Sequence, residues 1–204
     1  MKLLRKLYDW VLHWAETPYG APALFVLSFA EASFFPLPPD PLLIALILGS
    51  QSKAFRLAAT CTAASVSGAL LGYAIGYWIW WAEPGVFSPV ALFFFDNVPG
   101  FSVELFRYIQ DLFETWNFWI IFTAGFTPIP YKVFTVSGGA FAINLPMFIV
   151  ASMVSRGARF FLVAFLIWKF GARIKAFIDR YFNALAILFT ILLVGGFAAI
   201  RYVF

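Results

Sequence analysis

The stretch Pro36-Leu37-Pro38-Pro39-Asp40-Pro41 decides how this chain can fold. It lies between two apolar arms, residues 21–35 and 42–49, each shorter than the roughly 20 residues that a helix needs to cross a bilayer. Four prolines within six residues cannot lie inside one continuous helix, because proline lacks an amide hydrogen and disfavours a helical residue before it. We therefore predict a re-entrant hairpin over residues 21–50, which turns at the prolines and leaves on the side where it entered.

A second stretch, Thr127-Pro128-Ile129-Pro130-Tyr131-Lys132, repeats this arrangement later in the chain. It also lies between two short apolar arms, and it predicts a second re-entrant hairpin over residues 117–143. The two hairpin tips align at their prolines, Pro36 with Pro128 and Pro38 with Pro130. Broken helices repeated with opposite orientation are typical of secondary transporters, whose binding sites lie near the membrane midplane.

The composition also favours a membrane environment, because 63% of the 204 residues are hydrophobic and only 12% are charged. A water-soluble domain has about 25% charged residues, so this chain has too few polar side chains to cover a soluble surface. Cys61 and His13 are the only cysteine and histidine, which excludes an internal disulfide and a His/Cys metal cluster within one chain. We expect no metal and no cofactor.

The other apolar segments predict spanning helices and amphipathic helices at the membrane surface. We expect an interfacial helix over 1–19, a transmembrane helix over 57–81, an outer loop and interfacial helix over 83–116, a transmembrane helix over 146–168, and a cytoplasmic basic turn with a last transmembrane helix over 171–204. Residues 20–170 then form one membrane domain. The predicted fold is all-α and integral to the membrane, an inverted repeat of two opposed hairpins, each followed by a full transmembrane helix.

The basic residues support this topology. Nine Lys and Arg side chains lie on the cytoplasmic side, two lie outside and three lie within the membrane. This asymmetry follows the positive-inside rule and places the N-terminus in the cytoplasm. The basic clusters are short and flank apolar runs, so nucleic acid is not an expected partner.

Small residues recur every four positions along the first predicted transmembrane helix. Gly68, Gly72 and Gly76 follow Ala64 on one helix face. Such a stripe lets another helix approach closely, and we interpret it as a packing surface and nothing more.

Five ionisable residues fall at membrane depth, where a charge costs about 2.5–3.5 kcal/mol on insertion scales. They are Glu31, Asp40, Lys132, Arg156 and Arg159. We expect these side chains to face a polar cavity or one another. One interpretation is that they only neutralise each other and hold the hairpins together. The second is a binding site: one positive charge remains over, and arginine matches phosphate oxygens with its planar fork.

Three motifs of the chain resemble the DedA superfamily, also called the SNARE-associated Golgi or VTT-domain family, and within it the YqaA-like branch. The motifs are Glu31-x4-Pro36-x-Pro38-Pro39-Asp40, Gly125-Phe126-Thr127-Pro128-Ile129-Pro130-Tyr131-Lys132 and Arg156-Gly157-x-Arg159-Phe160. The resemblance covers residues 20–170. It implies a multi-pass protein of the bacterial inner membrane with two opposed re-entrant hairpins, which moves lipids such as polyprenyl phosphate between leaflets.

The resemblance also implies roles for individual residues. Glu31 and Asp40 match the acidic residues of the family's first hairpin, which would carry protons, and Lys132, Arg156 and Arg159 match basic residues that would bind substrate. The sequence departs from the family at Gly125, where many members have arginine, and at the second tip, where Lys132 replaces arginine.

The leading hypothesis is a lipid translocase, a flippase or scramblase, that moves a phosphorylated headgroup through a polar midplane cavity with a link to protons. Its expected partners are membrane lipids with anionic headgroups, and the sequence leaves a homo-oligomer open. A proton-coupled transporter of a small anion or osmolyte would use the same residues. A scaffold for envelope assembly, without transport, is the third hypothesis. No nucleophile–base pair is recognisable, so we do not expect an enzyme.

Overall fold

The computed structural model describes residue 14 and residues 17–35, 37–127 and 129–171. The predicted last transmembrane helix, most of the predicted interfacial helix over 1–19, Pro36 and Pro128 lie outside the described residues. The described part is helical except for one small strand pair. Its elements are α2 (Gly20–Ser33), α3 (Asp40–Gly49), the 3-10 turn η2 (Gln51–Lys53), α4 (Ala54–Trp80), β1 (Trp81–Glu83), β2 (Val86–Phe87), α5 (Pro89–Asn97), α6 (Val103–Phe126), α7 (Tyr131–Ala140) and α8 (Leu145–Phe170).

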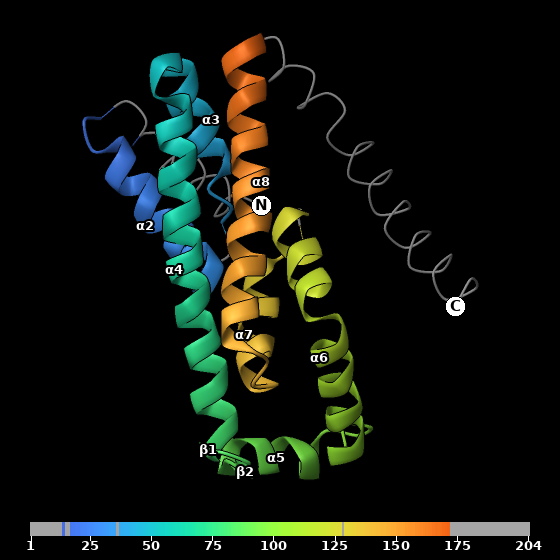
Figure 1. The fold of residues 1–204 in the computed structure, drawn as a ribbon. Coiled ribbons are helices and arrows are strands. Elements are labelled where there is room, and N and C mark those ends of the chain that lie inside the picture. The colour runs from blue at the N-terminus through green and yellow to red at the C-terminus, as the bar shows by residue number, and fades with distance from the viewer. Residues whose placement is uncertain (1–13, 15–16, 36, 128, 172–204) are drawn as a thin grey trace, which may run out of the picture.

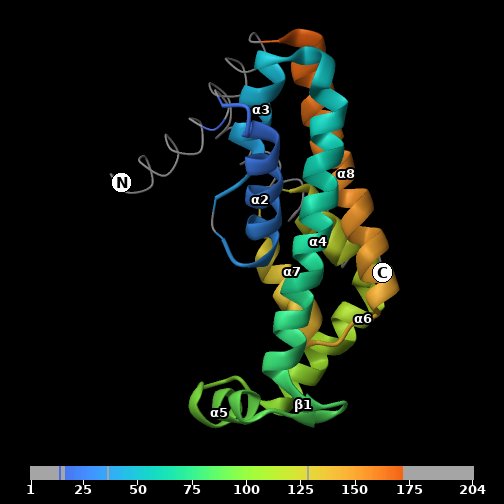
Figure 2. The same ribbon diagram turned by 90° about the vertical axis from the view of Figure 1, so that its left-hand side faces the viewer.

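Two long helices, α4 and α8, lie side by side (Figures 1 and 2). The span Gln51–Trp80, which is α4 with the turn before it, has 30 residues, and the span Leu145–Phe170, which is α8, has 26. Both are long and apolar enough to cross a membrane, and this length and composition indicate membrane association. Helix α4 covers residues 57–80 of the predicted span 57–81, and α8 covers the whole predicted span 146–168.

The first proline stretch separates α2 from α3, and the second separates α6 from α7. Helices α2 and α3, of 14 and 10 residues, lie in the upper half of Figure 1, and α7 lies in the lower half beside α6. Pro39 is the N-cap residue of α3 and Pro130 is the N-cap residue of α7, so each second arm begins at a proline. None of these short helices has the length to cross a bilayer.

Each hairpin packs against both long helices, with one arm on each. Helix α2 packs along α4, the long helix that follows it, and α6 packs along α8, which follows it. The second arms cross over: α7 packs against α4, and α3 packs against α8. Each long helix therefore contacts the first arm of its own half and the second arm of the other half.

Both hairpins pack closely against the glycine stripe of α4, which consists of Gly68, Gly72 and Gly76. A methyl group at Gly68 would overlap the carbonyl of Phe29 in α2, and one at Gly76 would overlap the carbonyl of Val136 in α7. Gly72 lies between them, against Thr135 of α7. Only a residue without a side chain permits backbone approach this close.

Residues 83–126 differ from the expected division into an outer loop and separate helices. Part of the predicted outer loop forms the strand pair β1–β2 and the helix α5, and Arg107 of α6 lies over the rings of Trp81 and Phe87, 5.6 and 5.1 Å from their centroids. The predicted interfacial helix and the first arm of the second hairpin both lie in α6, where two helical segments meet at a kink at Trp116, whose backbone is not helical (φ −108°, ψ 15°). The predicted boundary between residues 116 and 117 coincides with this kink.

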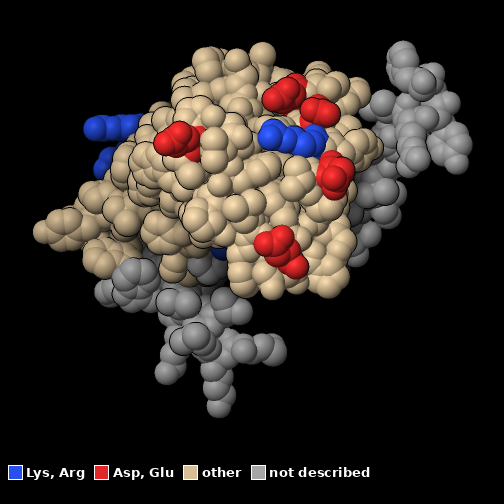
Figure 3. Space-filling model, turned by 90° about the horizontal axis from the view of Figure 1, so that it is seen from below, with Lys and Arg blue, Asp and Glu red and all other residues tan. Residues whose placement is uncertain are grey.

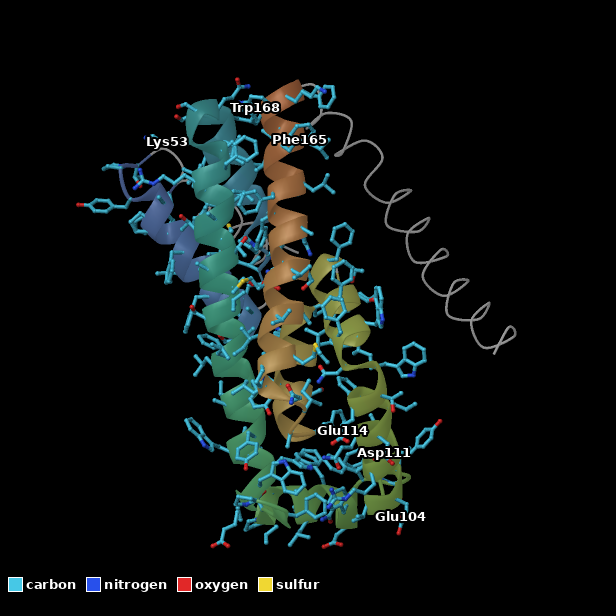
Figure 4. All side chains as sticks on the ribbon, in the orientation of Figure 1. Lys53, Glu104, Asp111, Glu114, Phe165 and Trp168 are labelled. Carbon is cyan, nitrogen blue, oxygen red and sulfur yellow. The ribbon has the colours of Figure 1, made fainter. Side chains whose placement is uncertain are left out.

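The two ends of the structure carry opposite charges. Lys53 lies at one end near Phe165 and Trp168, whereas Glu104, Asp111 and Glu114 lie at the other end (Figure 4). Figure 3 looks onto this second end, where acidic side chains outnumber basic ones. The first hairpin lies nearer the Lys53 end and the second hairpin nearer the acidic end (Figures 1 and 4).

Candidate functional site

All five ionisable residues predicted at membrane depth are within the described structure, and four of them form two ion pairs. Arg156 and Arg159 come from the middle of α8, three residues apart and therefore on one face of the helix. Glu31 lies near the end of α2, and Asp40 is the first residue of α3. The pairs join the first hairpin to the second long helix.

Arg156 is the most enclosed of these groups, with 2% of its side chain exposed. Its Nη2 contacts Oε2 of Glu31 at 2.5 Å, and its Nε donates to the Ser65 hydroxyl of α4 at 2.7 Å. The guanidinium also lies over the rings of Tyr131 and Phe160, 4.9 and 4.7 Å from their centroids. Arg156 thus connects α2, α4, α7 and α8, and the surrounding structure leaves almost no surface for a ligand.

Arg159 contacts both hairpin tips. Its Nη2 and Nε donate to the two carboxylate oxygens of Asp40, at 2.7 and 3.3 Å, in the forked geometry that suits a guanidinium. Its Nη1 donates to the backbone carbonyl of Thr127 at 2.7 Å. Asp40 begins the second arm of the first hairpin, and Thr127 ends the first arm of the second, so one side chain holds the two tips together.

This pair is more accessible than the deeper one. The side chains of Arg159 and Asp40 are 17% and 19% exposed, whereas Arg156 is 2% exposed and Glu31 is 12% exposed. The hydroxyl of Thr127, whose carbonyl accepts from Arg159, is buried and has no hydrogen-bond partner among the described residues. Leaving a buried hydroxyl without a hydrogen bond costs free energy, so this hydroxyl could still donate to or accept from a ligand near Arg159.

Lys132 is the fifth charge, and it differs from the other four. It is the second residue of α7 and is partly exposed. Among the described residues, no carboxylate forms a salt bridge with it. The first turn of α7 contains no acidic residue, and no side chain caps its N-terminus. The surplus positive charge expected from the sequence is therefore at the second hairpin tip.

Hydroxyl groups connect the hairpins to each other and to the long helices around these charges, and none of them is among the site residues predicted from the sequence. Thr135 of α7 donates to the carbonyl of Ala32 in α2 at 2.8 Å, and the Tyr131 hydroxyl donates to the Ser152 hydroxyl of α8 at 2.6 Å. Ser65 holds Arg156. Serine and threonine in apolar helices look like packing residues in a sequence, and only the contacts reveal their partners.

The departure at Gly125 has a local explanation. A side chain at this position would overlap the side chain of Ser155 on α8. Helices α6 and α8 approach each other at that point, so this packing leaves no room for an arginine.

Among the described residues, no group of three or more His, Cys, Asp or Glu side chains could hold a metal ion.

Two bacterial proteins resemble this chain along most of its length. An uncharacterized protein of Haemophilus influenzae is 35% identical over 184 residues, which cover 88% of this chain and 90% of that protein. An uncharacterized protein of Histophilus somni is 33% identical over 189 residues, which cover 88% of this chain and 91% of that protein. The chain belongs to their family. All five charged residues lie inside the shared region, because the match leaves only the ends of the chain uncovered.

No model of a known protein family matches the chain, and no solved structure matches it. Membership of the DedA superfamily stays a prediction from the motifs. The features of the structure that bear on function are the two ion pairs, the hairpin tips and Lys132.

Proposed function

We propose that this protein is a DedA-type lipid translocase of the bacterial inner membrane, with several membrane passes and a cytoplasmic N-terminus. Its substrate is a lipid with a phosphorylated headgroup, such as a polyprenyl phosphate or a phospholipid. The observation that carries the proposal is the position of Arg159, which contacts both hairpin tips midway along α8. Lys132 lies at the second tip and forms no salt bridge with any residue that the structure describes.

The exchange of partners among the helices supports an inverted repeat. In both halves the first arm packs on the following long helix and the second arm packs on the long helix of the other half. Transporters with this plan bind substrate where the broken helices meet. In this chain the broken helices meet at Arg159.

The chemistry of the tips favours a phosphate group. Among the described residues no side chain caps the N-terminus of α7, and the partial positive charge of a helix N-terminus attracts an anion. Lys132 adds a full charge there, and Arg159 offers the fork that matches two phosphate oxygens. Arg156, enclosed between Glu31 and Ser65, positions the site and does not contact the headgroup.

Exchange of partners on Arg159 gives a transport cycle. In the resting state the Asp40 carboxylate accepts two hydrogen bonds from the guanidinium of Arg159. An arriving phosphate competes with Asp40 for Arg159. Departure of the headgroup on the other side lets Asp40 pair with Arg159 again. The lipid tails stay in the bilayer throughout.

The test is lipid flipping by purified protein in liposomes, measured with fluorescent anionic phospholipid and with polyprenyl phosphate, with and without a pH gradient. Lys132→Gln and Arg159→Gln should each slow flipping by about tenfold or more, the loss expected for one charged hydrogen bond. Lys53→Gln is the matched control, because Lys53 is exposed at the end of the structure and away from the tips.

Other outcomes identify the alternative functions. Flipping at the normal rate by both Lys132→Gln and Arg159→Gln would refute the proposal. Uptake of inorganic phosphate into sealed vesicles without lipid movement would indicate a transporter of small anions. Complete complementation in cells by a Glu31→Gln, Arg156→Gln double variant would indicate a scaffold.

A further inference from the structure

An apolar groove of about 650 Å³ follows the exposed face of α2. Small side chains, Ala23 and Ala30, lie seven residues apart on this face, and larger apolar side chains stand beside them. The groove is lined almost entirely by carbon atoms. The lining residues that define its extent are Trp14, Tyr19, Ala23, Ala30, Phe35 and Leu42.

The groove connects two places that matter for a lipid. At one end are Trp14 and Tyr19, which precede α2, and aromatic residues of this kind are common at membrane–water interfaces. At the other end are Ala30, which is adjacent to Glu31, and Leu42, two residues after Asp40. The groove therefore runs along the first hairpin, and its lining includes residues that are close in sequence to Glu31 and Asp40.

The chemistry of the groove restricts what can occupy it. An extended peptide would bring N–H and C=O groups that find no partners on a carbon surface, and each unpaired group would cost several kcal/mol. A single hydrocarbon chain has no polar groups, and a groove of this size is within the range of pockets that enclose one small ligand.

We propose that this groove binds one hydrocarbon chain, acyl or isoprenoid, of a membrane lipid whose phosphate lies at the Asp40–Arg159 pair. This inference rests on the proposed function, and it adds the part of the substrate that the charged residues do not recognise. A bound chain would orient the headgroup toward Arg159 before the two carboxylate contacts are exchanged for phosphate.

The test uses an anionic phospholipid with a photoreactive diazirine in its acyl chain, incorporated in liposomes with the purified protein. Mass spectrometry then locates the cross-links. We expect them to concentrate on the groove, at Val26, Ala30 and Leu42, relative to the exposed lipid-facing residues Val150 and Val154 of α8. Equal labelling of both surfaces would overturn the proposal.

Two substitutions make the test specific. Ala30→Trp fills the groove from its floor, and Val26→Trp fills it from an exposed position, 65% accessible, that tolerates a large side chain. Each should lower groove labelling by about tenfold, because the chain loses its apolar contacts. Val150→Trp, on an exposed position of α8, is the control and should leave labelling unchanged.

The flipping assay separates this inference from the proposed function. Normal groove labelling in a protein that flips no lipid would support the groove and refute the translocase. Normal labelling and flipping in both Val26→Trp and Ala30→Trp, with Lys132→Gln inactive, would refute the groove and leave the translocase standing.

Discussion

The two hairpin tips have the same backbone plan and opposite charges. At the first tip, Pro39 is followed by Asp40, a carboxylate in the first turn of α3, where the helix dipole stabilises an anion. At the second tip, Pro130 is followed by Tyr131 and Lys132, so α7 begins with a cation where the dipole favours an anion. The first tip contains its own counter-charge, and the second lacks one.

Arg159 shows what this difference means for binding. It donates two hydrogen bonds to the Asp40 carboxylate at the first tip but only one to the Thr127 carbonyl at the second. The charge at the first tip, the Asp40 carboxylate, is neutralised by Arg159 of the same chain. Under the proposed function, the phosphate of a lipid would supply the missing anion at the second tip.

The largest expected effect comes from removing the charge that anchors the first hairpin. Arg156→Gln leaves Glu31 buried without its partner, which should destabilise the protein by about 3–5 kcal/mol. The double variant Glu31→Gln, Arg156→Gln should recover most of this loss, since no uncompensated charge remains. Thermal unfolding in detergent, followed by tryptophan fluorescence, measures both; equal losses in the single and double variants would contradict the ion pair.

The next effect compares how the hairpins dock on α4. Gly68→Leu should displace the first hairpin and Gly76→Leu the second, because each new side chain would overlap a backbone carbonyl. We expect losses of about 1–3 kcal/mol or more, as for other overpacked sites. Gly49→Ala is the control, since nothing lies within 4 Å of a side-chain carbon there. Unfolding midpoints unchanged by Gly68→Leu and Gly76→Leu would show that the stripe does not hold the hairpins.

A smaller effect tests the contact between the hairpins themselves. Ala32 belongs to the last turn of α2, whose carbonyl groups have no partners within the helix, and the Thr135 hydroxyl donates to one of them. Thr135→Val keeps the shape and removes this bond, so we expect a loss of about 1 kcal/mol. Thr60→Val is the control, because Thr60 bonds only within α4. A Thr135→Val protein as stable as the wild type would mean that the hairpins gain nothing from this bond.

The sequence predicts the parts of this architecture that depend on local rules. Proline spacing places the hairpin tips, and the change from an amphipathic to an apolar pattern coincides with the bend at Trp116. The need to neutralise charge at depth predicts that the ionisable groups pair, and four of the five do so. It cannot predict that Glu31 selects Arg156 and Asp40 selects Arg159, since residues more than 100 positions apart meet only through the packing of four helices.

The role of Ser65 and the groove along α2 could not be predicted for the same reason. A serine in a transmembrane pattern carries no sign that an arginine on another helix will need its oxygen. A groove is a space between elements, and alternating small and large side chains become a groove only after Phe35 and Leu42 fold back beside α2.

The smallest effect on stability is the sharpest test of the difference between the tips. Lys132→Asp gives the second tip the acidic first turn that the first tip already has. The carboxylate should stabilise α7 by about 0.3–1 kcal/mol through the helix dipole, so the unfolding midpoint should rise slightly. Transport should nevertheless be lost, because a fixed anion would occupy the place of the phosphate and repel it. A neutral Lys132→Gln protein should lose transport without the gain in stability. If Lys132→Asp still moved lipid at the normal rate, the second tip would not be the anion site.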